Sequence, residues 1–199
     1  MIASLSGTLA YKSPTEIVVD VRGVGYHVLI PLSTFEQLGA EKTDVRLLTY
    51  LHVRDDAMQL FGFATEDERT LFKLLISVTG IGPKMAQGIL SGVSVVDLRD
   101  HITRGNLAAL TAIPGIGRKL AERLIVELRD KIGKTSIVAP FPSTDLQTRI
   151  RSEALLALTS LGYNRAAAEK ALRTAIQESN GKDVSVEVLI KTALRHAAK

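Results

Sequence analysis

The sequence predicts a multidomain α+β fold: an N-terminal OB-type β-barrel (residues 1–63), a central all-α domain (64–134) and a C-terminal three-helix module (147–199). Three observations support this expectation. Residues 1–63 contain short β-branched runs separated by turn signals. A Gly-Ile-Gly phrase occurs twice within residues 64–134, each time between segments with helical periodicity. The last region contains three helix-length segments, near residues 147–160, 165–178 and 185–198, and a linker without periodicity at residues 135–146 precedes them.

The N-terminal region is expected to form five strands and one short helix. The strands are expected at residues 2–9, 15–21, 26–30, 45–53 and 58–63, and the helix near residues 34–38. Gly23 and Gly25 indicate a hairpin between the second and third strands. The last two strands are joined by Arg54-Asp55-Asp56-Ala57, a tight hairpin with an acidic tip. This number of short strands favours a small closed barrel of OB type.

The central region carries helix start and stop signals. Thr65 and Glu68 have the spacing of a capping box, and Pro83 suits the first position of a helix. Ser94 and Asn106 are candidate caps of two further short helices. The last helix of this region is expected to have an apolar face and to end at a glycine, with the residues Leu120, Leu124, Leu128, Ile132 and Gly133.

The repeated phrase predicts two helix-hairpin-helix motifs that bind the sugar-phosphate backbone of DNA. Two glycines separated by one residue allow positive φ and a close approach of a large ligand to the backbone. The amides after the second glycine belong to a helix N-terminus, which favours an anion, and a basic residue follows in both copies. A simple turn would not require this repeated cation. The candidate DNA-binding residues are Gly80, Ile81, Gly82, Lys84, Gly115, Ile116, Gly117, Arg118, Lys119 and Arg123.

Two nucleotide-binding motifs are excluded by single positions. A dinucleotide fingerprint would need glycine at the positions of Met85 and Leu120, and it would follow a strand. Residues 133–135 match the end of a P-loop, but Leu128 stands where that motif needs its first glycine. We therefore expect no cofactor and no nucleotide hydrolysis by this chain.

Composition indicates a cytoplasmic protein without a metal site. The 199 residues include no cysteine, and no apolar run is long enough to span a membrane. Residues 1–4 lack the basic start and apolar core of a signal peptide. The four histidines have no ligand spacing. The net charge of +4 is divided as −2 over residues 1–63, +3 over residues 64–134 and +3 over residues 135–199, so the hairpin region is cationic.

The order of these motifs resembles that of the RuvA family, the junction-binding subunits of the bacterial Holliday-junction branch-migration complex. The resemblance covers essentially the whole chain. It is carried by Gly23-Val24-Gly25-Tyr26, Val53-Arg54-Asp55-Asp56-Ala57, Phe61-Gly62-Phe63, Glu68-Arg69-Thr70-Leu71-Phe72, Gly80-Ile81-Gly82-Pro83-Lys84, Pro114-Gly115-Ile116-Gly117, Ala121-Glu122-Arg123-Leu124-Ile125-Val126-Glu127-Leu128 and Leu161-Gly162-Tyr163.

This resemblance implies a non-catalytic subunit that binds four-way DNA junctions, without sequence specificity, in an open and roughly square form. It implies a homotetramer, or two stacked tetramers, whose paired hairpins hold the minor-groove backbones of the arms. Asp55 and Asp56 would form an acidic pin at the junction centre. The resemblance also implies roles in recombination, DNA repair, DNA damage and the SOS response, with no membrane involved.

The resemblance further implies protein partners. The C-terminal module, through Leu161, Gly162 and Tyr163, would contact RuvB, the hexameric ATPase that drives branch migration, and a junction resolvase would join the same complex. Two features depart from the family pattern. Asp55 stands where the family often has glutamate, which shortens the reach and keeps the charge, and the linker is rather short, which would restrict the contact with RuvB.

Two other functions fit parts of the sequence. Asp55 and Asp56 are also residue types used by a helix-hairpin-helix nuclease or glycosylase, although no third carboxylate and no lysine nucleophile is suitably placed. A generic architectural protein that binds duplex DNA would use the same hairpins without a motor partner. Two plainer interpretations remain as well: a polar β-turn for the acidic tip, and a stabilising cap for the C-terminal module.

Overall fold

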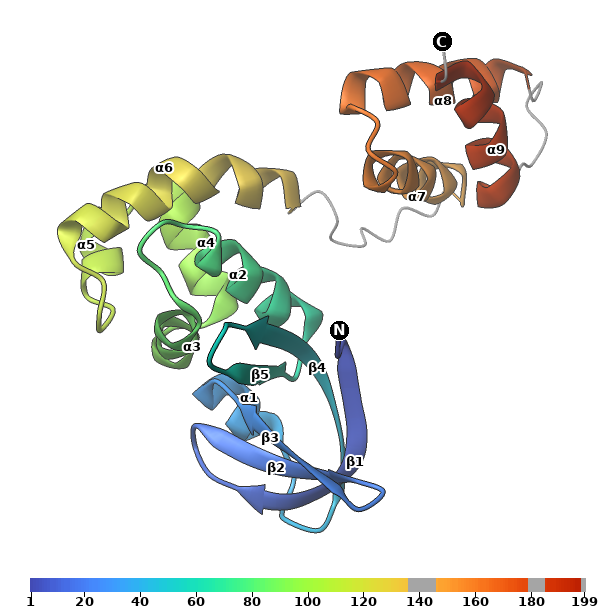
Figure 1. Cartoon of the computed structure of the whole chain (residues 1–199). Helices are drawn as coiled ribbons and strands as arrows, with labels where there is room; N and C mark the ends of the chain where they lie inside the picture. Colours follow the sequence, from blue (N-terminus) through green and yellow to red (C-terminus); the bar gives the residue numbers. More distant parts are fainter. Residues whose placement is uncertain (136–145, 179–184, 198–199) are drawn as a thin grey trace. The chain divides into compact units, whose positions relative to one another are not determined.

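The computed structural model describes residues 1–135, 146–178 and 185–197 (Figure 1). The chain divides into two units, Met1–Ile137 and Val138–Lys199, which we call unit 1 and unit 2. Strands β1 to β5 and helices α1 to α6 belong to unit 1, and helices α7 to α9 belong to unit 2. The expected linker, residues 135–146, lies outside the described residues except for its two ends.

A closed barrel forms the N-terminal part of unit 1. The neighbouring strands follow the order β1-β2-β3-β5-β4, and β4 pairs with β1 to close the ring. The contact between β3 and β5 is parallel, and the other pairs are antiparallel. This topology confirms the expected OB-type barrel. The elements are β1 (Ser4–Lys12), β2 (Glu16–Val21), β3 (Val24–Leu29), α1 (Leu32–Gln37), β4 (Asp44–Val53) and β5 (Met58–Phe63).

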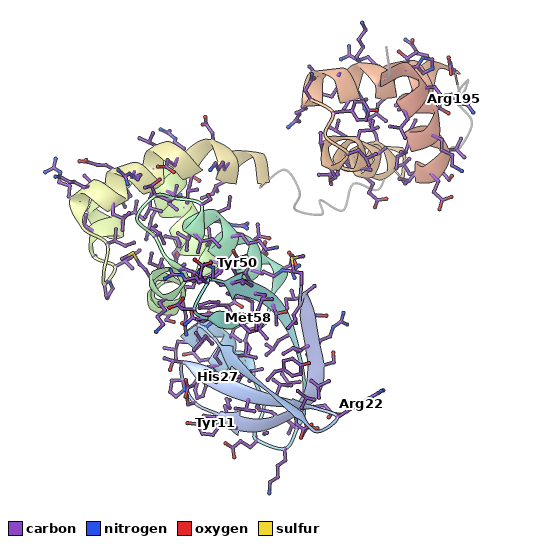
Figure 2. The ribbon with its side chains drawn as sticks, in the orientation of Figure 1. Tyr11, Arg22, His27, Tyr50, Met58 and Arg195 are labelled. Carbon is purple, nitrogen blue, oxygen red and sulfur yellow. The ribbon has the colours of Figure 1, made fainter. Side chains whose placement is uncertain are left out.

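Local backbone geometry explains two details of the barrel. Arg22 and Gly23 both have positive φ, 54° and 88°, as the tight turn between β2 and β3 requires. The Arg22 side chain extends from this turn into solvent (Figure 2). Strand β1 continues to Lys12, three residues beyond the expected end, because after an irregularity in register Tyr11 and Lys12 still pair with β2.

The helices of unit 1 begin where the sequence predicts caps. Thr65 and Glu68 form the complete capping box, Pro83 occupies the first turn of its helix, and the side chains of Ser94 and Asn106 accept backbone amides. The expected end at Gly133 is wrong, because the last helix continues through it. A glycine weakens a helix by about 1 kcal/mol relative to alanine and does not stop it. The helices are α2 (Glu66–Ile76), α3 (Pro83–Gly92), α4 (Val95–Arg104), α5 (Leu107–Thr111) and α6 (Arg118–Thr135).

The barrel and the helices of unit 1 share one apolar core. Phe61 and Phe63 of β5 are fully buried, and their rings lie 5.1 and 4.8 Å from the ring of Phe72 in α2. Tyr50 of β4 packs on the same ring at 5.4 Å. Leu124 and Leu128 of α6 belong to the same buried cluster. Burial of this size stabilises by roughly 1.5–3 kcal/mol per large side chain, so the barrel and the helices form one body.

A buried carboxylate adds polar contacts between the barrel and α2. Glu68 is only 2% exposed, and its carboxylate accepts hydrogen bonds from the hydroxyls of Ser33 and Thr34 in α1, the second at 2.9 Å. The same carboxylate accepts from the amides of Ala64 and Thr65 at 3.1 and 3.4 Å. A capping-box glutamate therefore also joins two elements that lie far apart in sequence.

A buried side-chain amide adds polar contacts between the barrel and α3. The Nε2 atom of Gln87 donates to the carbonyl oxygens of Thr15 and Ile30 at 2.9 and 2.7 Å. One turn later, the hydroxyl of Ser91 accepts from the amide of Leu32 at 3.0 Å. We call Glu68, Gln87 and Ser91, with the partners just named, the polar seam. The polar seam fixes α2 and α3 to the barrel.

Unit 2 consists of α7 (Leu146–Ser160), α8 (Arg165–Glu178) and α9 (Val186–Ala197), which confirms the expected three-helix module. Helix α7 ends in a Schellman motif: Gly162 has φ +94°, its amide donates to Thr159, and the amide of Tyr163 donates to Leu158. Asn164 then caps α8. The core is built mainly from small residues, with Ala154, Leu158, Ala168, Ala171, Leu172, Ala175, Leu189 and Ala193.

Candidate nucleic-acid interface

The first hairpin is a tight turn between α2 and α3. The amide of Ile81 donates to the carbonyl of Val78 at 3.1 Å, which closes a four-residue turn. Gly80, the third residue of this turn, has φ +98°. A closed turn with positive φ at its third residue matches type II, where glycine is strongly preferred.

The second hairpin repeats this turn between α5 and α6. The amide of Ile116 donates to the carbonyl of Ile113 at 3.0 Å, and Gly115 has φ +87°. Pro114 occupies the second position, where its fixed φ favours a type II turn. The repeat in the sequence is therefore a repeat in backbone conformation.

The second glycine of each hairpin has a different role from the first. We expected that Gly82 and Gly117 could need positive φ, but the described residues with positive φ include only Gly80 and Gly115 of these four glycines. Gly82 has φ −88° and ψ 168°, and it is the N-cap residue of α3. A Cβ atom at Gly82 or Gly117 would meet no atom within 4 Å. These glycines leave open space beside the helix N-terminus, which a ligand backbone can approach.

The amides behind this open space are available to an anion. Gly82 provides no side-chain cap, and within the described residues the amides of Lys84 and Met85 donate to no backbone carbonyl. At the start of α6, the same holds for the amides of Arg118 and Lys119. Helix N-termini with free amides attract phosphate because the amides and the helix dipole both favour negative charge.

The isoleucines of the two hairpins serve the fold. The side chains of Ile81 and Ile116 are 5% and 4% exposed and lie in the core of unit 1. They were candidate DNA-binding residues by sequence, but their side chains are turned away from solvent. They can reach DNA only through their backbone, and their side chains anchor each turn on the protein.

The cations of the two hairpins differ in their surroundings. Lys84 and Lys119 are exposed, and among the described residues their side chains form no ion pair and no hydrogen bond. Arg118 is 80% exposed at its side chain and lies 3.1 Å from Glu122 in the next turn of α6. An exposed pair of this kind is weak, so Arg118 remains accessible to a phosphate.

Arg123 lies differently from the other cations. Its Nη1 atom donates to the carbonyl of Thr79 in the first hairpin at 2.7 Å, and its Nε atom lies 3.9 Å from Glu127. Sequence spacing placed Arg123 with the second hairpin, on the helix that follows it. The structure brings its guanidinium to the first hairpin, a contact between residues 44 positions apart for which the sequence contains no signal.

The acidic tip is a short, exposed hairpin between β4 and β5. The amide of Arg54 donates to the carbonyl of Ala57 at 2.8 Å, and Asp55 and Asp56 lie between them with exposed side chains. Arg54 donates through Nε to His52 Nε2 at 3.0 Å. Within the described residues, the carboxylates of Asp55 and Asp56 form no ion pair, so their charge faces solvent.

An open hollow of about 320 Å³ joins the acidic tip to the first hairpin. Asp56 and Ala57 line it on the barrel side, and Gly82 and Lys84 line it on the α3 side. The acidic tip and the first hairpin are separate motifs in the sequence, and the fold brings them together. The hollow is also lined by Arg54, which belongs to the acidic hairpin motif, and by His52 and Gln59, which carry no motif signal in the sequence.

Comparison with known proteins covers the three regions in the same order. Family models match residues 1–62 (RuvA N terminal domain), residues 72–130 (SAM-like helix-hairpin-helix tandem) and residues 149–198 (RuvA, C-terminal domain). A protein of Chloroherpeton thalassium is 49% identical over 199 residues, which cover 98% of each chain. The chain belongs to the RuvA family. Proteins of Geobacter sp. strain M21 (46% identity, 98% of each chain) and Geotalea daltonii (45%, 100% of each chain) are similar too. All three relatives are named Holliday junction branch migration complex subunit RuvA.

The candidate partner-binding residues lie at the junction of α7 and α8 in unit 2. Leu161 is 61% exposed, more than the other exposed large apolar side chains in the described part of unit 2, such as Val188 at 52% and Leu156 at 48%. Gly162 adopts the left-handed conformation that ends α7, and Tyr163 packs partly against the core of unit 2. Leu161 therefore presents an apolar side chain on a fixed turn, and Gly162 and Tyr163 hold that turn.

Two features are absent from the residues that the structure describes. Over residues 1–135, 146–178 and 185–197, no three His, Cys, Asp or Glu side chains lie close enough together to hold a metal ion. In the same ranges, no helix combines the length and the apolar character that crossing a membrane requires.

Proposed function

We propose that this chain binds four-way Holliday junctions without reading sequence, holds them open, and recruits the RuvB ATPase for branch migration in recombination and repair. The observation that carries the proposal is the duplicated hairpin. Each copy combines a type II turn, free amides at a helix N-terminus and an exposed lysine. Contacts of this kind position a sugar-phosphate backbone and carry no sequence information.

The acidic tip supports a junction over a plain duplex as the ligand. Asp55 and Asp56 project as an exposed pair beside the hollow that also contains Gly82 and Lys84. A phosphate bound at the first hairpin would therefore lie near two negative charges. Repulsion between these charges and further phosphates disfavours a continuous duplex at this point and favours separated strands. Asp55 and Asp56 act in this proposal as an acidic pin.

Protein partners complete the proposal. Its active form is a homotetramer, or two stacked tetramers, because one chain supplies hairpins for one arm region of a four-armed ligand. Unit 2 contacts RuvB through the turn at Leu161, Gly162 and Tyr163, and the cytoplasm is the site of action. ATP hydrolysis belongs to RuvB, and a junction resolvase acts on the same junction. The exposed Leu161 supports the contact of unit 2 with a protein surface, since the fully buried core of such an interface is more apolar than its rim.

A competition experiment tests this function. A labelled four-way junction is titrated with protein, and unlabelled junction or linear duplex of equal length competes for it, in EDTA and in Mg²⁺. We expect the junction to compete at much lower concentration than the duplex, and neither DNA to be cut. Equal competition by the duplex would favour a generic architectural protein. Cleavage that depends on Mg²⁺ would favour a nuclease.

A further inference from the structure

The turn of the first hairpin is held by a side chain of α6, the helix that follows the second hairpin. Arg123 Nη1 donates to the carbonyl of Thr79 at 2.7 Å. A Cβ atom at Gly80 would lie 3.8 Å from the same nitrogen, so the guanidinium covers the left-handed residue of the turn. The Oε1 atom of Glu127, one turn further along α6, lies 3.9 Å from Arg123 Nε.

We propose that Arg123 is a positioning residue, which locks the first hairpin in its type II conformation and fixes it to α6. In this role its main contribution is not neutralisation of a phosphate. The inference rests on the proposed binding of junction DNA, and it revises the role that the sequence suggested for this arginine.

The carbonyl that Arg123 contacts determines the type of the turn. Thr79 and Gly80 are the central residues, and the peptide group between them is the one whose orientation distinguishes a type II turn from a type I turn. A hydrogen bond to the Thr79 oxygen therefore favours one orientation of this peptide directly. It also keeps Gly80 at positive φ, which sets the direction in which the chain enters α3.

The second hairpin achieves the same conformation by another route. Pro114 stands at the position of Thr79, and its ring fixes φ in the range that the turn needs. Within the described residues, no side chain donates to the Pro114 carbonyl. The first hairpin lacks a proline at this position and has the Arg123 contact. This difference between two otherwise equivalent turns argues that the contact has a conformational role.

The full-length protein can be tested with three variants. Arg123→Met removes the donor and the charge, Arg123→Lys keeps a charged donor of nearly the same reach, and Lys119→Ala removes an exposed cation from the second hairpin. Arg123 is 48% exposed at its side chain, so none of these changes removes a core residue. The first measurement is hydrogen exchange of the Ile81 amide in the free protein, because this amide closes the first turn.

We expect Ile81 to exchange about tenfold faster in the methionine variant and nearly at the wild-type rate in the lysine variant. Ile116, which closes the second turn, serves as the internal control and should not change. The second measurement is the dependence of junction affinity on salt. Lys119→Ala should lower the slope of log Kd against log salt by about 0.9 for each phosphate that the protein no longer neutralises. Arg123→Met should weaken junction binding several-fold, and its slope of log Kd against log salt should equal that of the wild-type protein.

Two results would overturn the inference. One is an unchanged exchange rate at Ile81 in the methionine variant. The other is a decrease in salt slope equal to that of Lys119→Ala, which would make Arg123 a phosphate-binding residue. If the wild-type protein did not prefer junctions, the proposed function would fail. The exchange measurement uses no DNA and would still decide whether Arg123 holds the turn.

Discussion

A serine in place of Gly82 or Gly117, the second glycine of each hairpin, should compete with DNA phosphate for the backbone amides at the helix N-terminus. Gly82 has the extended conformation of an N-cap residue, and a side chain there meets no atom within 4 Å. In Gly82→Ser, the hydroxyl can accept the Met85 amide, as N-cap serines do. Helix α3 should then gain a few tenths of a kcal/mol, while the anion site loses a donor and its open space. Gly117→Ser should act in the same way at α6.

The expected decrease in affinity follows from the hydrogen bond that the serine replaces. A hydrogen bond to a charged group contributes about 1.5–3 kcal/mol, so each variant should weaken junction binding roughly 10- to 100-fold. Fluorescence anisotropy with a labelled four-way junction measures this decrease, and calorimetric unfolding shows that the fold is kept.

Gly88 of α3 offers a matched control for these two variants. A Cβ atom at this position also meets no atom within 4 Å, but the residue lies inside the helix and away from its N-terminus. Gly88→Ala should keep wild-type affinity and raise stability by about 0.5–1 kcal/mol. If Gly82→Ser and Gly117→Ser bound junctions as tightly as wild type, the helix N-termini would not be the phosphate sites.

Three further predictions concern charge, selectivity and recruitment. Lys119→Ala should weaken all junction sequences equally in gel-shift titrations, since its contact is to phosphate, and a sequence-dependent effect would contradict this. Replacing both Asp55 and Asp56 by asparagine should leave the affinity for junctions unchanged or higher and raise the affinity for duplex several-fold. The effect should be largest at low salt, and paired titrations with the two DNAs measure it. If the double variant failed to bind junctions, the carboxylates would be structural. A chain ending at Pro140 should still bind junctions and fail to stimulate RuvB in a branch-migration assay, and full stimulation would refute the role of unit 2.

Local signals in the sequence were sufficient to predict the hairpins and most helix starts. A type II turn needs glycine at its third position and favours proline at its second, and both requirements are visible at Pro114 and Gly115. The capping box at Thr65 and Glu68 is equally local, because both partners lie within one turn of helix.

Contacts between distant residues could not be predicted in this way. Glu68 satisfies the capping-box pattern completely, so nothing local indicates that Ser33 and Thr34 also bind its carboxylate. Gln87 resembles any polar residue of an amphipathic helix until the barrel carbonyls are placed against it. The same reason explains why Arg123 was grouped with the hairpin next to it in sequence. The expected helix end at Gly133 was wrong for a different reason: a glycine is compatible with a helix end but does not require one.

The polar seam has a mechanical consequence for a DNA molecule that moves through the proposed complex. Shearing the barrel against α2 and α3 would leave the buried groups of Glu68 and Gln87 unpaired, at about 1–3 kcal/mol for each group. The polar seam therefore resists movement of α2 and α3 against the barrel while a duplex advances in the proposed complex. Successive phosphates would then meet the same amides and lysines of the proposed site, so the contacts would change little from one step to the next. In the proposed complex, unit 1 would then keep its shape while the DNA moves past it.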